Sequence, residues 1–150
     1  MKMSNVAINK MQLKLPSLSS NEGMARAAVA AFISQMDPTA IELADIKCAI
    51  SEAVTNAIVH GYKNSQGYIS INVWLLEGRV AKIQIRDKGC GIPDVKLARQ
   101  PLYTTDRESE RSGMGFTVME SFMDKIKVTS KVGSGTSVTL YKVLSERSIT

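Results

Sequence analysis

The chain has 150 residues, enough for one domain with a sizeable core but not for two. Apolar residues make up 44% and charged residues 22%, as in an ordinary globular protein. The net charge of +5 comes from scattered basic residues that acids interrupt. A typical nucleic-acid binder has a continuous basic stripe with interleaved aromatics, so we expect no direct nucleic-acid partner. Mild basicity suits an acidic protein partner at least as well.

Cysteines and hydropathy indicate the compartment. Cys48 and Cys90 lie far apart and form no metal-ligand pattern, which favours a reducing compartment. The apolar run at 29–33 is far too short to span a bilayer, and no secretory signal is visible at the N-terminus. We therefore expect a cytoplasmic protein that does not bind a membrane.

The first half of the chain predicts one strand and two helices. Residues 11–15 alternate as a short strand. Helical patterns follow at about 21–36 and about 40–60. Thr39 can cap the second helix, and Gly61 stands where a helix C-terminal glycine belongs.

The second half predicts two hairpins separated by a long loop and a helix. The segment 92–112 is polar, contains two prolines and has at most a short helix near 94–99. A loop of this length in a small domain is usually functional, often a lid. The remaining predicted elements are strands at about 68–76, 80–86, 125–131 and 136–142, and a helix at about 115–123.

These elements predict an α/β (α+β) two-layer sandwich over 1–150, with flexible ends at about 1–8 and 144–150. We expect one mixed, largely antiparallel sheet that helices cover on one face. The other face must be less apolar or must meet a partner.

Three polar residues on the second predicted helix are spaced four apart and share one side of it: Glu52, Asn56 and His60. The side-chain oxygen of Asn56 can serve Mg²⁺, which prefers oxygen ligands completed by phosphate and water. Glu52 can accept a proton from an attacking hydroxyl. His60 can contact phosphate. A solvated helix edge, ending in an ordinary histidine, explains the same spacing.

Asp87 follows a predicted strand and precedes Gly89 and Gly91. A carboxylate only accepts hydrogen bonds, so it can read the exocyclic amine of adenine and reject guanine. The glycines let the backbone approach the base and ribose, and the Thr136 hydroxyl, in the turn 133–136, can supplement Asp87. Elsewhere this pattern is more often an ordinary turn.

The segment Gly113, Met114, Gly115 and Phe116 opens the next predicted helix. Backbone amides and the positive helix end suit phosphate there, so we expect the segment to bind nucleotide. A plain helix start is the alternative, and the Phe116 side chain also suits the core.

The predicted lid carries three further candidates. Arg111 can reach the terminal phosphate and stabilise charge in the transition state. Thr104 and Thr105 offer hydroxyls to the nucleotide. Solvated loop polarity, with Arg111 paired to a nearby glutamate, would explain all three equally.

Four segments in this order and spacing resemble the Bergerat-type ATP site of gyrase, Hsp90 chaperones, histidine kinases and MutL: 52–57, 86–93, 113–116 and 133–136. One branch is more similar still. The segments 51–62, 98–105, 110–116 and 119–124 resemble the sporulation anti-sigma factor F family, from about residue 13 to 144.

The resemblance implies a homodimeric serine protein kinase that uses ATP and Mg²⁺. Such proteins bind and silence the sporulation sigma factor F with ATP bound, and phosphorylate a serine of the anti-sigma factor antagonist. It implies that Glu52 is the catalytic base, Asn56 the magnesium ligand, Asp87 the adenine reader and Arg111 a phosphate contact. It also implies that Arg26 contacts sigma; by itself Arg26 is a charge on a helix face.

One departure and three alternatives remain open. Asp106-Arg107 replaces a lysine-proline pair of the family, which can change lid flexibility. A silent ATP/ADP-gated sigma-binding module would keep the same residues. The catalytic half of a histidine kinase would need an upstream histidine-bearing helix pair, and gyrase-like or chaperone ATPases need further domains.

Overall fold

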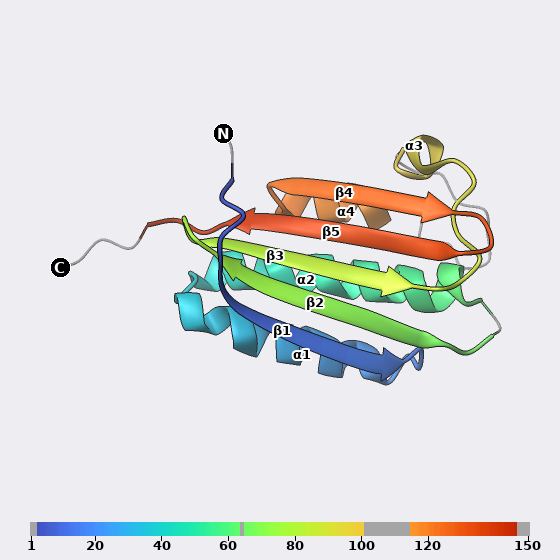
Figure 1. The fold of residues 1–150 in the computed structure, drawn as a ribbon, viewed down its shortest axis with the longest axis horizontal. Helices are drawn as coiled ribbons and strands as arrows, with labels where there is room; N and C mark the ends of the chain where they lie inside the picture. The colour runs from blue at the N-terminus through green and yellow to red at the C-terminus, as the bar shows by residue number, and fades with distance from the viewer. Residues whose placement is uncertain (1–2, 64, 101–114, 147–150) are drawn as a thin grey trace.

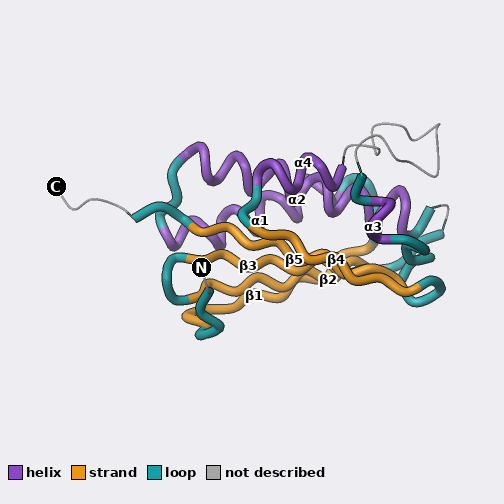
Figure 2. Tube along the Cα trace, turned by 90° about the horizontal axis from the view of Figure 1, so that it is seen from above, coloured by secondary structure: helices purple, strands orange, loops and turns teal. Residues whose placement is uncertain are grey.

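A computed structural model of the chain describes residues 3–63, 65–100 and 115–146. It forms two layers, with helices packed on one face of a five-stranded sheet (Figures 1 and 2). In chain order the elements are β1 (Ala7–Pro16), α1 (Asn21–Ile33), η1 (Ser34–Met36), α2 (Ala40–Asn56), η2 (Ala57–Gly61), β2 (Tyr68–Leu76), β3 (Val80–Asp87), α3 (Val95–Ala98), α4 (Gly115–Phe122), β4 (Lys125–Lys131) and β5 (Gly135–Val143).

The strand order is β1-β2-β3-β5-β4, and every described ladder is antiparallel. The sequence predicted a mixed sheet, and this detail is wrong. The chain returns from α4 along the outer edge as β4, and β5 then folds back between β4 and β3. Strand β5 thereby opposes both neighbours in direction, so the helical connection creates no parallel pair.

The core lies between the sheet and the helices. The inward positions of β2 and β3 alternate with polar ones, as expected for a sheet with one covered face. Fully buried side chains come from both layers: Val29, Ile33, Ile46, Ile50, Val54, Ile71, Val73, Ile83, Ile85, Met119 and Leu140. The expected two-layer sandwich is therefore confirmed.

Helix α2 starts where its cap predicts. The Thr39 hydroxyl accepts a hydrogen bond from the Glu42 amide at 3.1 Å, and the Glu42 carboxylate accepts one from the Thr39 amide at 2.8 Å. This reciprocal capping box satisfies two of the free amides at the helix start. On the helix flank, Asp45 pairs with Lys142 of β5 at 3.2 Å and joins the two layers.

The end of α2 differs from the prediction. The α-helix stops at Asn56, and 57–61 form a single π-helical turn in which the Tyr62 amide donates to the Ala57 carbonyl. Gly61 does not adopt the left-handed backbone of a terminal glycine; Lys63, at φ 52°, does. The wider π turn changes the rotation per residue over 57–61, so the four-residue spacing of the sequence no longer by itself puts His60 on the side of Glu52 and Asn56.

Candidate functional site

Asp87, the last residue of β3, lies beside the end of the π turn. Its carboxylate accepts a hydrogen bond from the Gly89 amide at 2.9 Å. Burial raises the pKa of Asp87, and hydrogen bonds from the Gly89 and Thr136 amides partly oppose this rise. A half-buried carboxylate in a fixed orientation can discriminate between donors and acceptors on a ligand.

Gly61 and Gly135 make room for Asp87. A Cβ on Gly61 would lie 2.9 Å from the Asp87 side-chain carbon. A Cβ on Gly135, which has φ +114°, would lie 2.1 Å from the Asp87 carbonyl oxygen. The closeness of these two backbones to Asp87 therefore depends on glycine at both positions.

Gly89 and Gly91 are needed for a reason that the sequence did not reveal. We expected both to open space for the base and ribose. A Cβ on Gly89 would lie 2.1 Å from the Gly61 carbonyl oxygen, and one on Gly91 would lie 2.3 Å from the Lys131 carbonyl oxygen. Gly91 also has φ +79°. Both glycines therefore accommodate the protein's own backbone and set the path of the loop after Asp87.

Two neighbouring turns hold this loop. The Cys90 amide donates to the Gly61 carbonyl at 2.8 Å, and the Gly133 amide donates to the Cys90 carbonyl at 2.8 Å. The Cys90 thiol also lies 3.2 Å from the His60 carbonyl oxygen. The π turn, the loop after β3 and the β4–β5 turn are thus bonded into one rigid corner.

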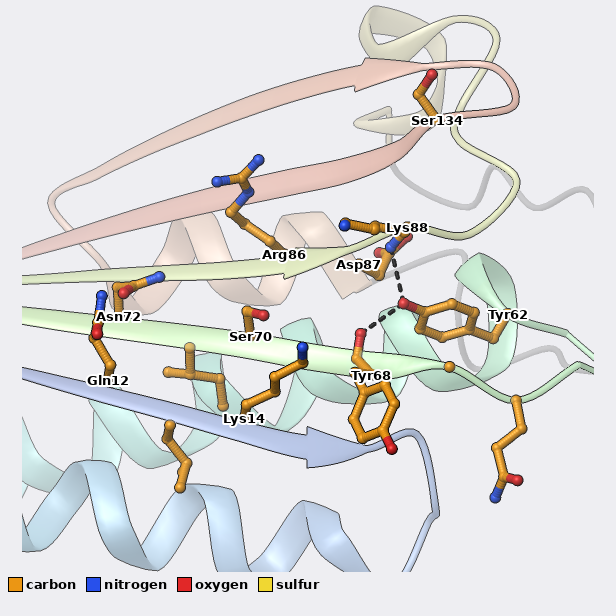
Figure 3. A pocket seen from close by; sticks show the side chains of 14 residues that line it. Gln12, Lys14, Tyr62, Tyr68, Ser70, Asn72, Arg86, Asp87, Lys88 and Ser134 are labelled. Carbon is orange, nitrogen blue, oxygen red and sulfur yellow. Dashed lines mark hydrogen bonds between the residues drawn. The ribbon is translucent and has the colours of Figure 1, made fainter.

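Tyr62 was missed by the sequence analysis. Its hydroxyl accepts a hydrogen bond from the Lys88 amide at 2.9 Å and donates one to the Tyr68 carbonyl at 2.5 Å (Figure 3). The ring packs against Gly67, where a Cβ would lie 2.3 Å from it. Tyr62 therefore fixes the backbone next to Asp87 from the end of the helical layer. The aromatic residue straight after Gly61 was its only signal in the sequence.

Ser130, also missed, connects Thr136 to the loop. The two hydroxyls lie 2.8 Å apart, and the Ser130 hydroxyl accepts a hydrogen bond from the Ile92 amide at 2.7 Å. Thr136 pairs with Asp87 across β3 and β5. The expected neighbours Asp87 and Thr136 thus share one end of the sheet.

Glu52 and Asn56 lie one turn apart on the last part of α2, both half-buried. Asn56 faces the start of α4, because a Cβ on Gly115 would lie 3.1 Å from its side-chain nitrogen and 3.2 Å from its side-chain oxygen. Glycine at 115 thereby lets the first turn of α4 approach Asn56. The Phe116 side chain packs into the core, so only its backbone is suited to the expected nucleotide contact.

A magnesium ion at this site would take most of its ligands from outside the protein. Within the described parts of the chain, no three His, Cys, Asp or Glu side chains form a metal cluster. The Asn56 amide oxygen, beside the open backbone of Gly115, is the hard ligand that Mg²⁺ accepts. These residues fit an ion whose remaining ligands are phosphate and water.

Arg26 is held in place rather than free on a helix face. Its guanidinium donates to Glu22 on α1 and to the Ser51 hydroxyl on α2, both at 3.0 Å. Its side chain is still 42% exposed. Arg26 therefore presents a fixed positive charge beside Ser51, the residue before Glu52 on α2.

Five of the expected site residues lie outside the described residues: Thr104, Thr105, Arg111, Gly113 and Met114. The same holds for Asp106-Arg107 and for most of the expected lid. At the described start of that segment, α3 confirms the predicted short helix, and Asp94 caps it by accepting a hydrogen bond from the Leu97 amide at 3.0 Å. Arg99, just after α3, pairs with Glu120 of α4 at 2.6 Å.

The comparisons with known proteins give the class of this domain. Residues 15–142 match the histidine kinase-like ATPase domain family. The most similar curated proteins that we compared indicate a narrower family within that class. The chain is 54% identical to the anti-sigma F factor of Geobacillus stearothermophilus, over 93% of this chain and 95% of the relative. It is 55% identical to the anti-sigma F factor of Bacillus licheniformis, over 92% and 94%. The chain belongs to the anti-sigma F factor family.

Solved structures share the fold at lower identity. The crystal structure of the RsbU and RsbW domains of Rv1364c from Mycobacterium tuberculosis superposes with a TM-score of 0.68 at 21% identity, over 93% of this chain and 33% of that one. A histidine kinase domain from Erythrobacter litoralis EL346 gives 0.53 at 17% identity, over 82% and 61%. Among the described residues, no helix has the length and apolar character to cross a membrane.

Proposed function

We propose that the protein binds and silences the sporulation sigma factor F in its ATP-bound state and phosphorylates a serine of the anti-sigma factor antagonist. The observation that carries this proposal is the 54% identity to an anti-sigma F factor over 95% of the relative's length. The corner around Asp87 supports it, because it offers the expected adenine-reading carboxylate in a rigid frame.

In this proposal Asp87 accepts a hydrogen bond from the exocyclic amine of adenine. Gly115 and Phe116 offer backbone amides to phosphate at the start of α4. Five residues of the segment before α4 are proposed to contact the nucleotide, with Arg111 at its terminal phosphate: Thr104, Thr105, Arg111, Gly113 and Met114. Gly89 and Gly91 shape the base pocket, and His60 is proposed to lie near the phosphates.

Glu52 is the proposed general base. It accepts the proton of the serine hydroxyl while the serine oxygen bonds to the γ-phosphorus and the bond to the β-phosphate oxygen breaks, releasing ADP. Mg²⁺, proposed to be held through Asn56, supplies charge neutralisation on the phosphates. Since phosphoryl transfer needs mainly positioning and electrostatic stabilisation, these few groups suffice.

The proposed assembly is a homodimer that holds the sigma factor through Arg26. The bonds from Arg26 to Glu22 and Ser51 fix its guanidinium in an exposed place, as a binding residue requires. Arg26 lies on α1 and its partner Ser51 precedes Glu52 on α2, so the proposed sigma contact is hydrogen-bonded to the helix that carries the proposed catalytic base. An Arg26→Ala variant should lose sigma binding and keep ATP binding.

Transfer of labelled γ-phosphate from Mg-ATP to the purified antagonist tests the kinase assignment. Wild type, Glu52→Gln and the matched control Glu77→Gln, in the β2–β3 turn, are compared. Label with wild type and the control, but not with Glu52→Gln, supports the proposal. Equal label in all three removes Glu52 from the mechanism. No label in any of them, with ATP and sigma still bound, leaves a catalytically silent ATP-gated module.

A further inference from the structure

The sheet face opposite the helices carries an alternating row of lysines and aromatic rings. Cross-strand pairing brings Lys10, Trp74, Lys82, Tyr141 and Lys125 into line across all five strands. The ammonium groups of Lys10 and Lys82 lie 4.9 and 4.7 Å from the Trp74 ring centre. Those of Lys82 and Lys125 lie 5.8 and 5.5 Å from the Tyr141 ring centre. Cation–π attraction thus holds the lysine heads in a fixed row.

Beside this row lies a polar groove. Its volume is about 860 Å³, and it runs over β1, β2 and the end of β3 (Figure 3). Next to the lysine–aromatic row, Gln12 and Asn72 pair across β1 and β2 and offer amide groups. Further along, Lys14, Ser70 and Arg86 form the next row across the sheet. On this face the amide row therefore lies between two cationic rows, and the groove takes in the amide row and the row of Lys14 and Arg86.

This face has one sign of charge. Its outward-facing cations come from β1, β3 and β4: Lys10, Lys14, Lys82, Arg86, Lys125, Lys127 and Lys131. On the described strands, no aspartate or glutamate occupies an outward-facing position of this face. Such a surface attracts an anionic partner and orients its approach.

We propose that this face is a docking surface for an acidic segment of a partner protein bound in extended conformation. Two other occupants fit less well. A second copy of the chain placed face to face would oppose cations with cations, which is unfavourable. Single-stranded nucleic acid stacks its bases on open aromatic faces, whereas lysine heads cover Trp74 and Tyr141 here.

The spacing of the rows defines the segment. Lys10 and Lys14 are four residues apart on β1, so the two cationic rows are separated by about 13 Å. An extended peptide spans the same distance between side chains four residues apart. A carboxylate at every fourth position would therefore meet both cationic rows, and a polar side chain between them would meet Gln12 and Asn72.

Amide chemical-shift mapping with a synthetic peptide bearing glutamate at every fourth position tests this surface. Shifts should concentrate on β1, β2 and β3. The charge reversals Lys82→Glu and Arg86→Glu should each weaken binding by about tenfold or more. Lys47→Glu, on an exposed position of α2, makes the same charge change in the helical layer and should alter affinity less than about twofold. Because Arg86 is exposed, Arg86→Glu should fold and can test the surface even if Lys82→Glu does not fold.

Several results would overturn the proposal. Shifts spread over both faces, or equal weakening by Lys47→Glu, would show general charge attraction. A peptide isomer with its glutamates adjacent that binds as tightly would remove the spacing argument. Tighter binding of a uridine oligonucleotide of equal charge, with quenched Trp74 fluorescence, would assign the face to nucleic acid. Self-association that Arg86→Glu abolishes would assign it to a second copy.

Discussion

Replacing Asp87 with asparagine removes the charge of this carboxyl and keeps an oxygen that can accept the hydrogen bond of the Gly89 amide. The local frame should therefore survive, since Tyr62, Gly61 and the loop amides do not depend on that charge. What changes is the group presented to adenine: an acceptor-only carboxylate becomes an amide with its own donor.

The expected loss follows from one hydrogen bond. A bond to a charged group contributes about 1.5–3 kcal/mol, so the dissociation constant for ATP should rise about 10- to 150-fold. Stability should not fall in parallel. Burial raises the pKa of Asp87, which means that holding it ionised at neutral pH costs folding free energy. Asp87→Asn should therefore melt at the wild-type temperature or above it.

Titration calorimetry measures the ATP affinity of wild type and Asp87→Asn, and thermal melting measures their stability. Asp124→Asn is the matched control, because Asp124 also accepts a backbone hydrogen bond, from Val143 at 2.6 Å. Asp124 lies at the opposite end of β4 from the Asp87 corner. A folded Asp87→Asn protein with less than about threefold loss of ATP affinity would refute the assignment of Asp87 to adenine.

The pH dependence has a defined sign. Because the folded-state pKa of Asp87 lies above its unfolded value, its stabilising contribution is complete below the unfolded pKa and is lost as pH rises through the folded pKa. ATP affinity should change in the opposite direction, falling as pH drops through the folded pKa and Asp87 takes up a proton. The control Asp124→Asn should show this fall, and Asp87→Asn should not.

Three further substitutions test the frame around the site. Tyr62→Phe removes two hydrogen bonds at the hydroxyl and should lower the free energy of unfolding by about 1–3 kcal/mol. The melting temperature should fall by about 3–10 °C, and ATP should bind more weakly. An unchanged melting temperature would contradict the bridging role. Thr39→Ala should lose the capping box, about 1 kcal/mol, and leave ATP affinity unchanged, as calorimetry on the folded protein can check. Gly61→Ala should displace Asp87 and weaken ATP binding about tenfold or more, and wild-type affinity would show that the carboxylate is not held there.

Local sequence patterns were sufficient to predict most of the helices and strands. The strand pattern predicted β2 with its observed bounds, and Thr39 as a cap predicted the start of α2. Two local patterns predicted the site residues: the four-residue spacing of Glu52 and Asn56, and the Asp87 motif after β3. The structure places these residues near the end of α2 and in the neighbouring loop. These signals depend on neighbours in sequence, which is why one chain is enough to read them.

Only the tertiary structure showed the π turn, the bridging hydroxyl of Tyr62 and the backbone contacts that require glycine at 89 and 91. The hydroxyl bridge from Tyr62 to Lys88 and the glycine contacts arise where segments distant in the chain meet, so no local pattern predicts them. The cationic face is the clearest case. Its lysines are scattered along the sequence, in which almost no aromatic residues alternate with them. Strand alternation directs them to one side and cross-strand pairing sets Lys82 between Trp74 and Tyr141. The sequence by itself determined the kind of site, whereas the register of the sheet decided which charges share a surface.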